Sequence, residues 1–462
     1  MHKVVYIEYD FAKLLQNGGI AMLLEFKMKN YKSFKDECVF SMKVAPKQKG
    51  LDYSILSEKI GRNVHKALSS AVIYGPNASG KTNIIGAMET FKQIVLRGHI
   101  RNVEVKDSPN AASNALELIP NNTLSAAEPV DFSITFIDHG ILFEYAISLD
   151  LGRFLERDHE RKVLMETLRV DDALVFSRGD ATLQVGDMGV VQSYLVPAYE
   201  QNAKGAAALA QSSLHNEELF LANGFKTMFS ARLASMIAQW MDKSFIVIYR
   251  SDSMQLVRKF SEPKKQSVFI EKTLNDAAAL FGVNSNALGY VMDGEHEEAQ
   301  LCSIFKGDVK STAIPVDLFE SFGTIRFINL FPLVLQTLRK GGVLVVDEFD
   351  ASIHPMALMN IITLFHNDEL NTHRAQLVFN THNPIFLNSN LFRRDEIKFV
   401  DRDDETHCST HYSLSDFGTA GVNGVRKTED YMKNYFVDRY GAIKSIDLAP
   451  VIRSLLDKNK EE

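Results

Sequence analysis

One eight-residue motif limits what this chain can fold into more than any other feature of its sequence. Residues 75–82 read Gly-Pro-Asn-Ala-Ser-Gly-Lys-Thr, which has the spacing G-x-x-x-x-G-K-[ST]. The apolar run 71–74 before the motif predicts a buried strand, and 83–89 predicts the first turns of a helix. A strand, a glycine-containing loop and a helix N-terminus together direct backbone N–H groups and the helix dipole at one anion. Because both flanks fit, we favour a phosphate-binding loop over a chance match.

The side chains of this loop have separate predicted roles toward a bound nucleotide. Lys81 would neutralise the β- and γ-phosphates, and the Thr82 hydroxyl would bind Mg²⁺. Other groups along the loop would contact the nucleotide as well. The nucleotide-binding residues that the motif predicts are Gly75, Asn77, Ser79, Gly80, Lys81, Thr82 and Asn83.

Composition places the chain among ordinary globular proteins. It has 462 residues, of which 45% are hydrophobic and 24% charged, enough for two or three domains. No apolar run approaches the roughly 20 residues that span a bilayer, and the N-terminus lacks a signal-peptide pattern. We therefore expect a cytoplasmic protein with no membrane partner. The three cysteines are scattered, without metal or disulfide spacing.

The net charge of −7 argues against a broad nucleic-acid surface, which is usually basic. Small basic clusters occur, for example around Lys27 and Lys29. We interpret these as solvated surface, although a nucleic-acid groove stays open as an alternative.

Two adjacent acids follow a second apolar run far along the chain. Asp347 and Glu348 come directly after the predicted strand 343–346, so their carboxylates would emerge at the carboxyl edge of the sheet, where ligands of open α/β sheets bind. Asp347 would hold Mg²⁺, directly or through water. Glu348 would polarise the attacking water. The alternative is a strand that ends in a solvated turn.

A histidine is expected over the same crevice. His382 follows the next predicted strand, 377–379, and neighbouring parallel strands end at one edge. We favour contact of His382 with the γ-phosphate over a surface or core role. Asp350, close behind the two acids, is assigned to the nucleotide site as well.

These residues resemble the heads of ABC-type ATPases. The run 347–350 with 352–355 and Thr381-His382 looks like the second half of such a head, and Glu320-Ser321-Phe322-Gly323-Thr324 before an apolar helix looks like its signature segment. By pattern, the chain is most similar to the prokaryotic SMC- and OLD-like group, especially short ATPases of abortive-infection and other antiphage systems. The opening 26–34 and the late 440–443 match that group too.

The resemblance implies ATP and Mg²⁺ as cofactors and two heads that sandwich the nucleotides. Ser321 and Gly323 of one head would contact the γ-phosphate bound to the other. An ordinary helix cap is the alternative for Ser321. Three departures stand out: Phe322 replaces the small residue of transporter signatures, 101–130 contains no Gln to sense the metal and water, and Lys32 has either a phosphate or a surface role.

The expected fold is α/β: a P-loop NTPase of ABC-head type with a mainly parallel sheet core, an N-terminal antiparallel β portion and an inserted helical lid. Met22 begins a plausible first strand, and the residues before it are expected to carry little structural weight. The predicted divisions are 22–155 (first part of the head), 156–310 (lid), 311–445 (second part of the head) and 446–462 (tail).

The resemblance implies an ATP-hydrolysing switch or sensor in prokaryotic antiviral defence, and we expect it to act on a separate effector. About 80 residues follow His382, without a nuclease-type acidic cluster, so we expect the effector, a nuclease by analogy, to be encoded nearby. A phage protein or nucleic acid would be the trigger. The main alternative is a DNA-repair or chromosome-associated ATPase, which would need long coiled-coil arms or a basic groove. A scaffold that never hydrolyses ATP is disfavoured by Glu348.

Overall fold

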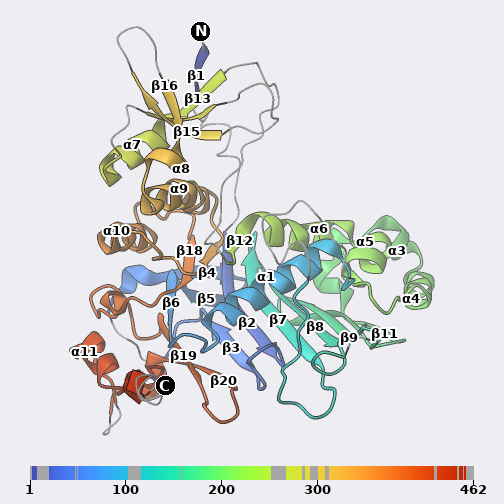
Figure 1. Cartoon of the computed structure of the whole chain (residues 1–462). Helices are drawn as coiled ribbons and strands as arrows, with labels where there is room; N and C mark the ends of the chain where they lie inside the picture. Colours follow the sequence, from blue (N-terminus) through green and yellow to red (C-terminus); the bar gives the residue numbers. More distant parts are fainter. Residues whose placement is uncertain are drawn as a thin grey trace.

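A six-stranded sheet forms the centre of the protein (Figure 1). The structure is a computed structural model that describes residues 3–7, 20–46, 48, 50–101, 116–156, 158–250, 267–283, 287–291, 300–306, 312–420, 424–444, 447–450 and 452–453. The order of the central sheet is β12-β17-β18-β6-β19-β20, and all neighbours are parallel except β19 and β20. The strands are β6 (Ser70–Tyr74), β12 (Phe245–Ile248), β17 (Val343–Val346), β18 (Gln376–Asn380), β19 (Ile397–Arg402) and β20 (Ser409–Ser413).

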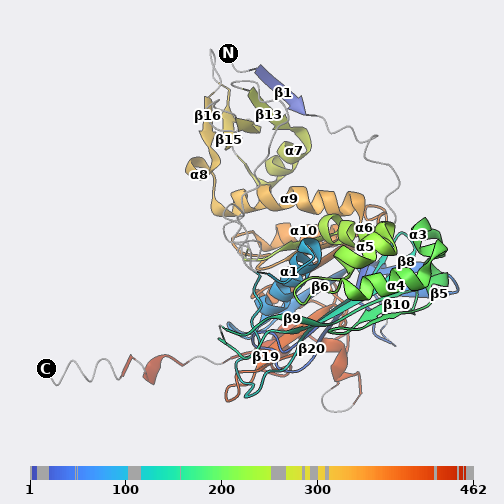
Figure 2. The ribbon, with the colours of Figure 1, turned by 90° about the vertical axis from the view of Figure 1, so that its right-hand side faces the viewer.

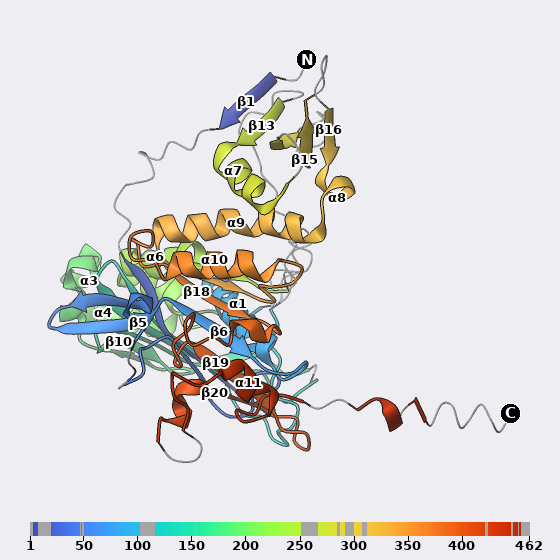
Figure 3. The ribbon, with the colours of Figure 1, turned by 90° about the vertical axis from the view of Figure 1, so that its left-hand side faces the viewer.

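Both faces of this sheet are buried, which explains why its strands are almost wholly apolar. Alternate residues point to opposite faces: Ala71 and Ile73 join the cluster around α1 (Lys81–Arg97), whereas Val72 and Tyr74 join a second cluster. The second cluster includes α9 (Phe322–Lys340) and α10 (Pro355–Phe365), which lie next to each other on that side (Figure 3). The predicted parallel sheet covered by helices is confirmed.

A seven-stranded antiparallel sheet packs on the other side of α1. Its order is β11-β10-β9-β8-β7-β2-β3, and the rings of Phe26 and Phe132 both lie against Phe91 of α1, at 6.0 and 6.1 Å between centroids. The predicted antiparallel portion is confirmed and is larger than expected. Its strands are β2 (Ala21–Lys29), β3 (Cys38–Ser41), β7 (Val130–Asp138), β8 (Ile141–Asp150), β9 (Lys162–Val170), β10 (Ala173–Arg178) and β11 (Leu183–Val185).

The predicted division at 155/156 does not follow the sheets. Strands β9 to β11 continue the antiparallel sheet, and β12 joins the central one. The helices between them cover the antiparallel sheet (Figure 2), and Trp240 stacks on Phe136 of β7 at 4.0 Å. Recognisable motifs stop near 155 although the hydrogen-bonded sheet continues, which is why the sequence suggested a boundary there. These helices are α3 (Pro197–Gln201), α4 (Ala203–Ser212), α5 (Lys226–Met228) and α6 (Ala231–Gln239).

A small five-stranded sheet stands beyond α9 (Figures 1 and 3). Leu288 and Val316 from this part pack with Ile328 of α9. Its first strand pairs with β13 in parallel, so the expectation of little structural weight before Met22 is wrong for Lys3–Ile7. A local pattern cannot reveal pairing with a strand so distant in sequence. The elements are β1 (Lys3–Ile7), β13 (Ser267–Glu271), β14 (Ala287–Val291), β15 (Gln300–Phe305), β16 (Thr312–Pro315), α7 (Lys272–Phe281) and α8 (Val316–Phe319).

Smaller elements complete the molecule. β4 (Ile55–Ile60) and β5 (Asn63–Leu68) form a hairpin, and α11 (Tyr431–Phe436) packs on the central sheet. The predicted tail at 446–462 lies largely outside the described residues. Within the described residues, no helix combines the length and the apolar character needed to cross a membrane.

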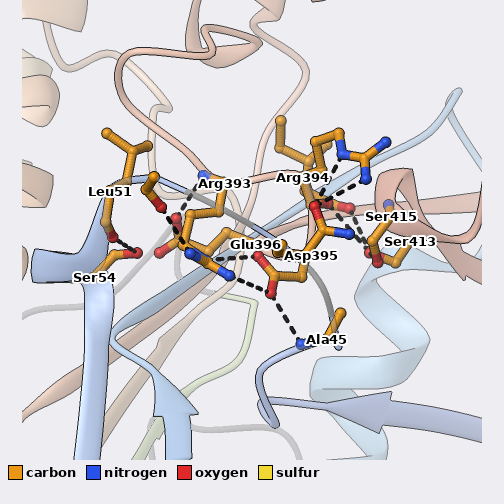
Figure 4. A network of polar contacts seen from close by, with 12 residues as sticks. Ala45, Leu51, Ser54, Arg393, Arg394, Asp395, Glu396, Ser413 and Ser415 are labelled. Atoms are coloured by element: carbon orange, nitrogen blue, oxygen red, sulfur yellow. Dashed lines mark hydrogen bonds and ion pairs between the residues drawn. The ribbon is translucent and has the colours of Figure 1, made fainter. Parts of the chain in front are cut away.

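A buried ionic network fixes the start of β19 (Figure 4). Arg393 donates from Nε and Nη2 to Asp395 at 2.9 and 3.0 Å, and from Nη1 to the Gly50 carbonyl at 2.7 Å. Asp395 also accepts from the Ala45 N–H at 3.0 Å. Because buried charges are costly unless partnered, these bonds hold Ala45 and Gly50 against the start of β19.

Candidate functional site

The phosphate loop lies between β6 and α1, as the sequence predicts, and its glycines are sterically required. A Cβ on Gly75 would lie 2.2 Å from the Val400 carbonyl oxygen. Gly80 has φ +112°, a left-handed conformation that favours glycine, and a Cβ there would lie 2.6 Å from Ser409 Oγ. β19 and β20 therefore press closely against the loop from one side.

The side chain of Lys81 folds back over the phosphate loop. Its Nζ donates to the carbonyl oxygens of Gly75 and Pro76 at 2.7 and 2.9 Å. Burial lowers the pKa of Lys81 to about 8, although Asp347, Glu348 and Asp350 act in the opposite direction. A phosphate would therefore restore to this ammonium group the stabilisation that it loses on burial.

Ser79 offers a second sign of an anion site. Its Oγ is buried and has no hydrogen-bond partner among the described residues. Buried hydroxyls are normally paired, and this one lies on the wall of the same cavity as Lys81. The donors present therefore fit a bound phosphate chain.

The distant acids reach the phosphate loop. Thr82 Oγ1 donates to Asp347 Oδ1 at 3.0 Å, and Asp347 is only 3% exposed. The other carboxylate oxygen accepts from the Arg250 N–H at 3.3 Å. A hydroxyl and a carboxylate are hard oxygen ligands of the kind that Mg²⁺ takes together with substrate phosphates. The pair fits Mg²⁺, and its role as ligand stays a prediction.

Asn380 joins the two acids, a role that the sequence analysis missed. Its Nδ2 donates to Asp347 Oδ1 at 2.6 Å, and its Oδ1 accepts from the Glu348 N–H. Arg326 donates to the Glu348 carbonyl oxygen, and Glu348 itself has φ +51°. These bonds hold Glu348 in a backbone conformation that few non-glycine residues adopt, so its backbone is fixed from both β18 and α9.

Replacing Asn380 with Ala should weaken Mg²⁺ binding about 10- to 100-fold, because groups that orient a metal ligand typically have effects of this size. The measurement is the Mg²⁺ concentration that half-saturates ATP turnover. Asn383→Ala is the matched control, since Asn383 follows on the same loop and caps the Ile385 N–H instead. Equal Mg²⁺ dependence in both variants would remove Asn380 from this role.

His382 faces the same cavity as Glu348. Partial burial lowers the pKa of His382, and the positive charge of Lys81 lowers it further, while Asp350 and Asp347 raise it. The imidazole is therefore neutral at pH 7 and can donate one hydrogen bond to a phosphate oxygen.

The cavity has a volume of about 450 Å³. Most of the predicted site residues line this cavity, and the others are not part of its lining. Of these others, Asp347 contacts the lining residue Thr82. The negative charge of Asp350 raises the pKa of both Lys81 and His382. The predicted residues that line the cavity are Asn77, Ser79, Gly80, Lys81, Thr82, Asn83, Glu348 and His382.

Lys32 belongs to the cavity wall, and its contact with phosphate stays a prediction. It forms an ion pair with Glu117 and lies 3.2 Å from Tyr249 Oη. The adjacent Ser33 accepts from Asn83 Nδ2 at 2.7 Å. Burial lowers the pKa of Lys32, although Glu117 raises it. The further cavity residues that sequence reasoning missed are Ile119, Pro120, Asn122, Phe154, Arg402 and His407.

The signature-like segment lies at the start of α9, outside this cavity. Ser321 caps the helix by accepting from the Thr324 N–H at 3.2 Å, so the capping role is present. A Cβ on Gly323 would lie 2.1 Å from the Ser352 carbonyl oxygen. Between them, Phe322 is 85% exposed. The contact of Ser321 and Gly323 with a second head stays a prediction.

Comparison with protein families gives one match that covers more than half of the chain. Residues 70–194 and 207–388 match the family described as "AAA domain, putative AbiEii toxin, Type IV TA system". The chain belongs to this family. The match contains the phosphate loop, both acids and His382, and it supports the predicted class of P-loop ATPases. No curated protein matches the chain.

Among solved structures, two SMC heads are similar at low levels. The "SMC head domain from Thermotoga maritima" has 12% identity and a TM-score of 0.32, with 85% of this chain and 98% of that one covered. The "SmcHead bound to the C-winged helix domain of ScpA" has 12% identity and a TM-score of 0.38, with 86% and 99% covered. Similarity this low carries no information on function.

Proposed function

We propose that the protein binds and hydrolyses Mg²⁺-ATP at the cavity between the phosphate loop and the carboxyl ends of β17 and β18. The observation that supports this best is the 3.0 Å bond between Thr82 and Asp347. It brings a nucleotide-binding loop and a pair of acids, which are distant in sequence, to one cavity that Glu348 and His382 also line.

The residues divide the work in the proposed reaction. Lys81 exchanges its bonds to the loop carbonyls for bonds to the β- and γ-phosphate oxygens. N–H groups of the loop at the start of α1 donate to the same phosphates. Mg²⁺, when bound, supplies charge neutralisation on the phosphates. Glu348 orients the attacking water and polarises it, while His382 donates to the γ-phosphate.

We propose further that ATP joins two copies of the chain. Ser321 of one copy would contact the γ-phosphate held by the other. Exposed apolar side chains next to Ser321 support an interface at this place, since such residues in a group mark interaction surfaces. These are Leu318, Phe319 and Phe322, which are 80%, 46% and 85% exposed.

The biological role that we propose is a nucleotide-dependent switch in prokaryotic antiviral defence that acts on a separate effector protein, a nuclease by analogy. The description of the family names a toxin of toxin–antitoxin systems, which supports a partner protein encoded nearby. A phage protein or nucleic acid would supply the trigger. A role on DNA is less well supported, because the net charge is −7.

Replacing Ser321 with Arg should prevent assembly while leaving nucleotide binding intact, because the larger cation would occupy the contact with the second copy. The measurement is the molar mass in solution with Mg²⁺ and a slowly hydrolysed ATP analogue, together with the affinity for that analogue. Losing the cap costs only about 1 kcal/mol of stability.

Asn202→Arg is the matched control, since Asn202 is an exposed cap of α4 that accepts from the Gly205 N–H at 2.9 Å. Wild-type protein and this control should double in mass with the analogue, and Ser321→Arg should not. A wild-type protein that stays monomeric under these conditions would refute the ATP-joined dimer.

A further inference from the structure

The sheet order divides the cavity into two ends. β6, which leads into the phosphate loop, lies between β18 and β19. The predicted catalytic groups all come from one side: Glu348 follows β17 and His382 follows β18. Arg402, at the end of β19, lies on the opposite side of β6 and lines the same cavity. If the γ-phosphate is held on the β18 side, the rest of the nucleotide extends away from that side, toward Arg402.

Arg402 is held in place by a structured turn. Between β19 and β20, Asp403 Oδ1 accepts from the Thr406 N–H at 2.7 Å and from the Thr406 hydroxyl at 2.8 Å. The guanidinium group donates from Nε to the His407 carbonyl at 3.0 Å and from Nη1 to the Ala78 carbonyl at 3.3 Å. The planar group is thus fixed between the turn and the phosphate loop before any ligand binds.

The same turn is anchored a second time, next to the loop. The Ser409 N–H donates to the Ser33 carbonyl at 2.7 Å, and the Ser409 hydroxyl donates to the Ser79 carbonyl. Ser409 is 6% exposed. These contacts fix the turn that follows Arg402 relative to the phosphate loop, and so keep Arg402 next to the cavity.

Part of the cavity lining suits a flat group such as a nucleotide base. Neither hydrogen bond of the Arg402 guanidinium group is to an acid, and no ion pair of Arg402 occurs within the part of the chain that the structure describes. Ile119, Pro120 and Phe154 give the cavity apolar lining, and Phe154 is 40% exposed. A guanidinium plane and an aromatic ring are both surfaces on which a purine stacks.

We propose that Arg402 is the base-binding residue of this site and that it stacks on the purine ring of the nucleotide. The inference rests on the proposed function, because it takes the γ-phosphate to lie near Glu348 and His382. Stacking does not read the edge of a base, so Arg402 serves ATP and GTP equally. The discrimination that it provides is between a nucleoside triphosphate and a bare triphosphate.

The test compares two probes, ATP and inorganic tripolyphosphate, each titrated with Mg²⁺ into the full chain by calorimetry. Arg402→Ala should weaken ATP binding roughly 10-fold, in the range of a lost stacking contact, and leave tripolyphosphate binding unchanged. Arg402→Lys keeps the charge but not the plane, so it should lose most of the same affinity. Arg169→Ala is the matched control, since Arg169 is exposed on β9 and also donates to a backbone carbonyl, at 3.1 Å.

Three results would overturn the inference. An equal loss for both probes would assign Arg402 to the phosphates, and full retention of ATP affinity would remove it from the site. If Arg402→Lys binds ATP as wild type does, charge alone is enough and stacking is excluded. Failure of the proposed function looks different, because wild-type protein would then bind neither probe.

Discussion

Glu348→Gln should lower ATP turnover roughly 10²- to 10⁴-fold while ATP still binds, because an amide cannot accept the proton that a general base removes from water. The change preserves the shape of the side chain. Asn380 and Arg326 hold Glu348 through its backbone N–H and carbonyl groups, which the substitution leaves in place, so the loop should keep its conformation. A protein that binds ATP but does not cleave it should accumulate in the assembled state.

The measurements are steady-state phosphate release, ATP affinity and molar mass in the presence of Mg²⁺-ATP. Glu369→Gln serves as the control, since Glu369 is an exposed acid after α10 that does not line the cavity. Unchanged phosphate release in Glu348→Gln would assign the activation of water to another group. A loss of ATP affinity equal to the loss of turnover would show a binding role instead.

The parts of this site that the sequence predicts are those that lie at the carboxyl ends of buried strands. The motif at 75–82 carries its own flanking strand and helix, and the acids follow an apolar run, so a short window is enough in each case. Asn380 obeys the same rule, because it ends β18 two residues before His382. A polar residue at that position could have been assigned from the sequence.

The residues at the other end of the cavity could not be predicted, because they are brought there by contacts between segments that are distant in the sequence. Arg402 reaches Ala78 only because β19 pairs with β6, and Lys32 reaches Glu117 across a stretch of 85 positions. The extent of the antiparallel sheet was underestimated for the same reason. Strand neighbours are decided by pairing and by shared core residues, and these are properties of the folded chain.

Lys81→Ala should weaken ATP binding by about 2–5 kcal/mol, or roughly 30- to 5000-fold in Kd. Lys81 is the one positively charged residue of the loop 75–82, so the substitution leaves a buried phosphate charge without its cationic partner on that loop. Turnover should fall in parallel at any practical ATP concentration. The free protein should remain folded, since Lys81 bonds to two backbone carbonyl groups, those of Gly75 and Pro76, to which water can donate once the ammonium group is removed.

The measurements are ATP affinity by calorimetry and the rise in the unfolding midpoint that ATP causes, which follows directly from binding to the folded state. The variant without ATP should unfold near the wild-type temperature, and ATP should no longer raise that temperature. Lys92→Ala is a useful comparison, because Lys92 lies on the same helix and donates to the Phe245 carbonyl at 2.8 Å, remote from the cavity lining. Equal ATP affinity in wild type and Lys81→Ala would refute the assignment of the loop.

The lowered pKa of Lys81 supplies an independent readout of the same role. With a pKa of about 8 in the free protein, the side chain is charged below pH 8 and largely neutral at pH 9, whereas ATP binding requires the charged form. ATP affinity should therefore be constant up to about pH 8 and then fall by up to roughly tenfold per pH unit, with uptake of a proton on binding. Lys81→Arg stays charged throughout this range, so whatever affinity it retains should not change between pH 7 and 9. A decline of the same steepness in Lys81→Arg would show that another group titrates.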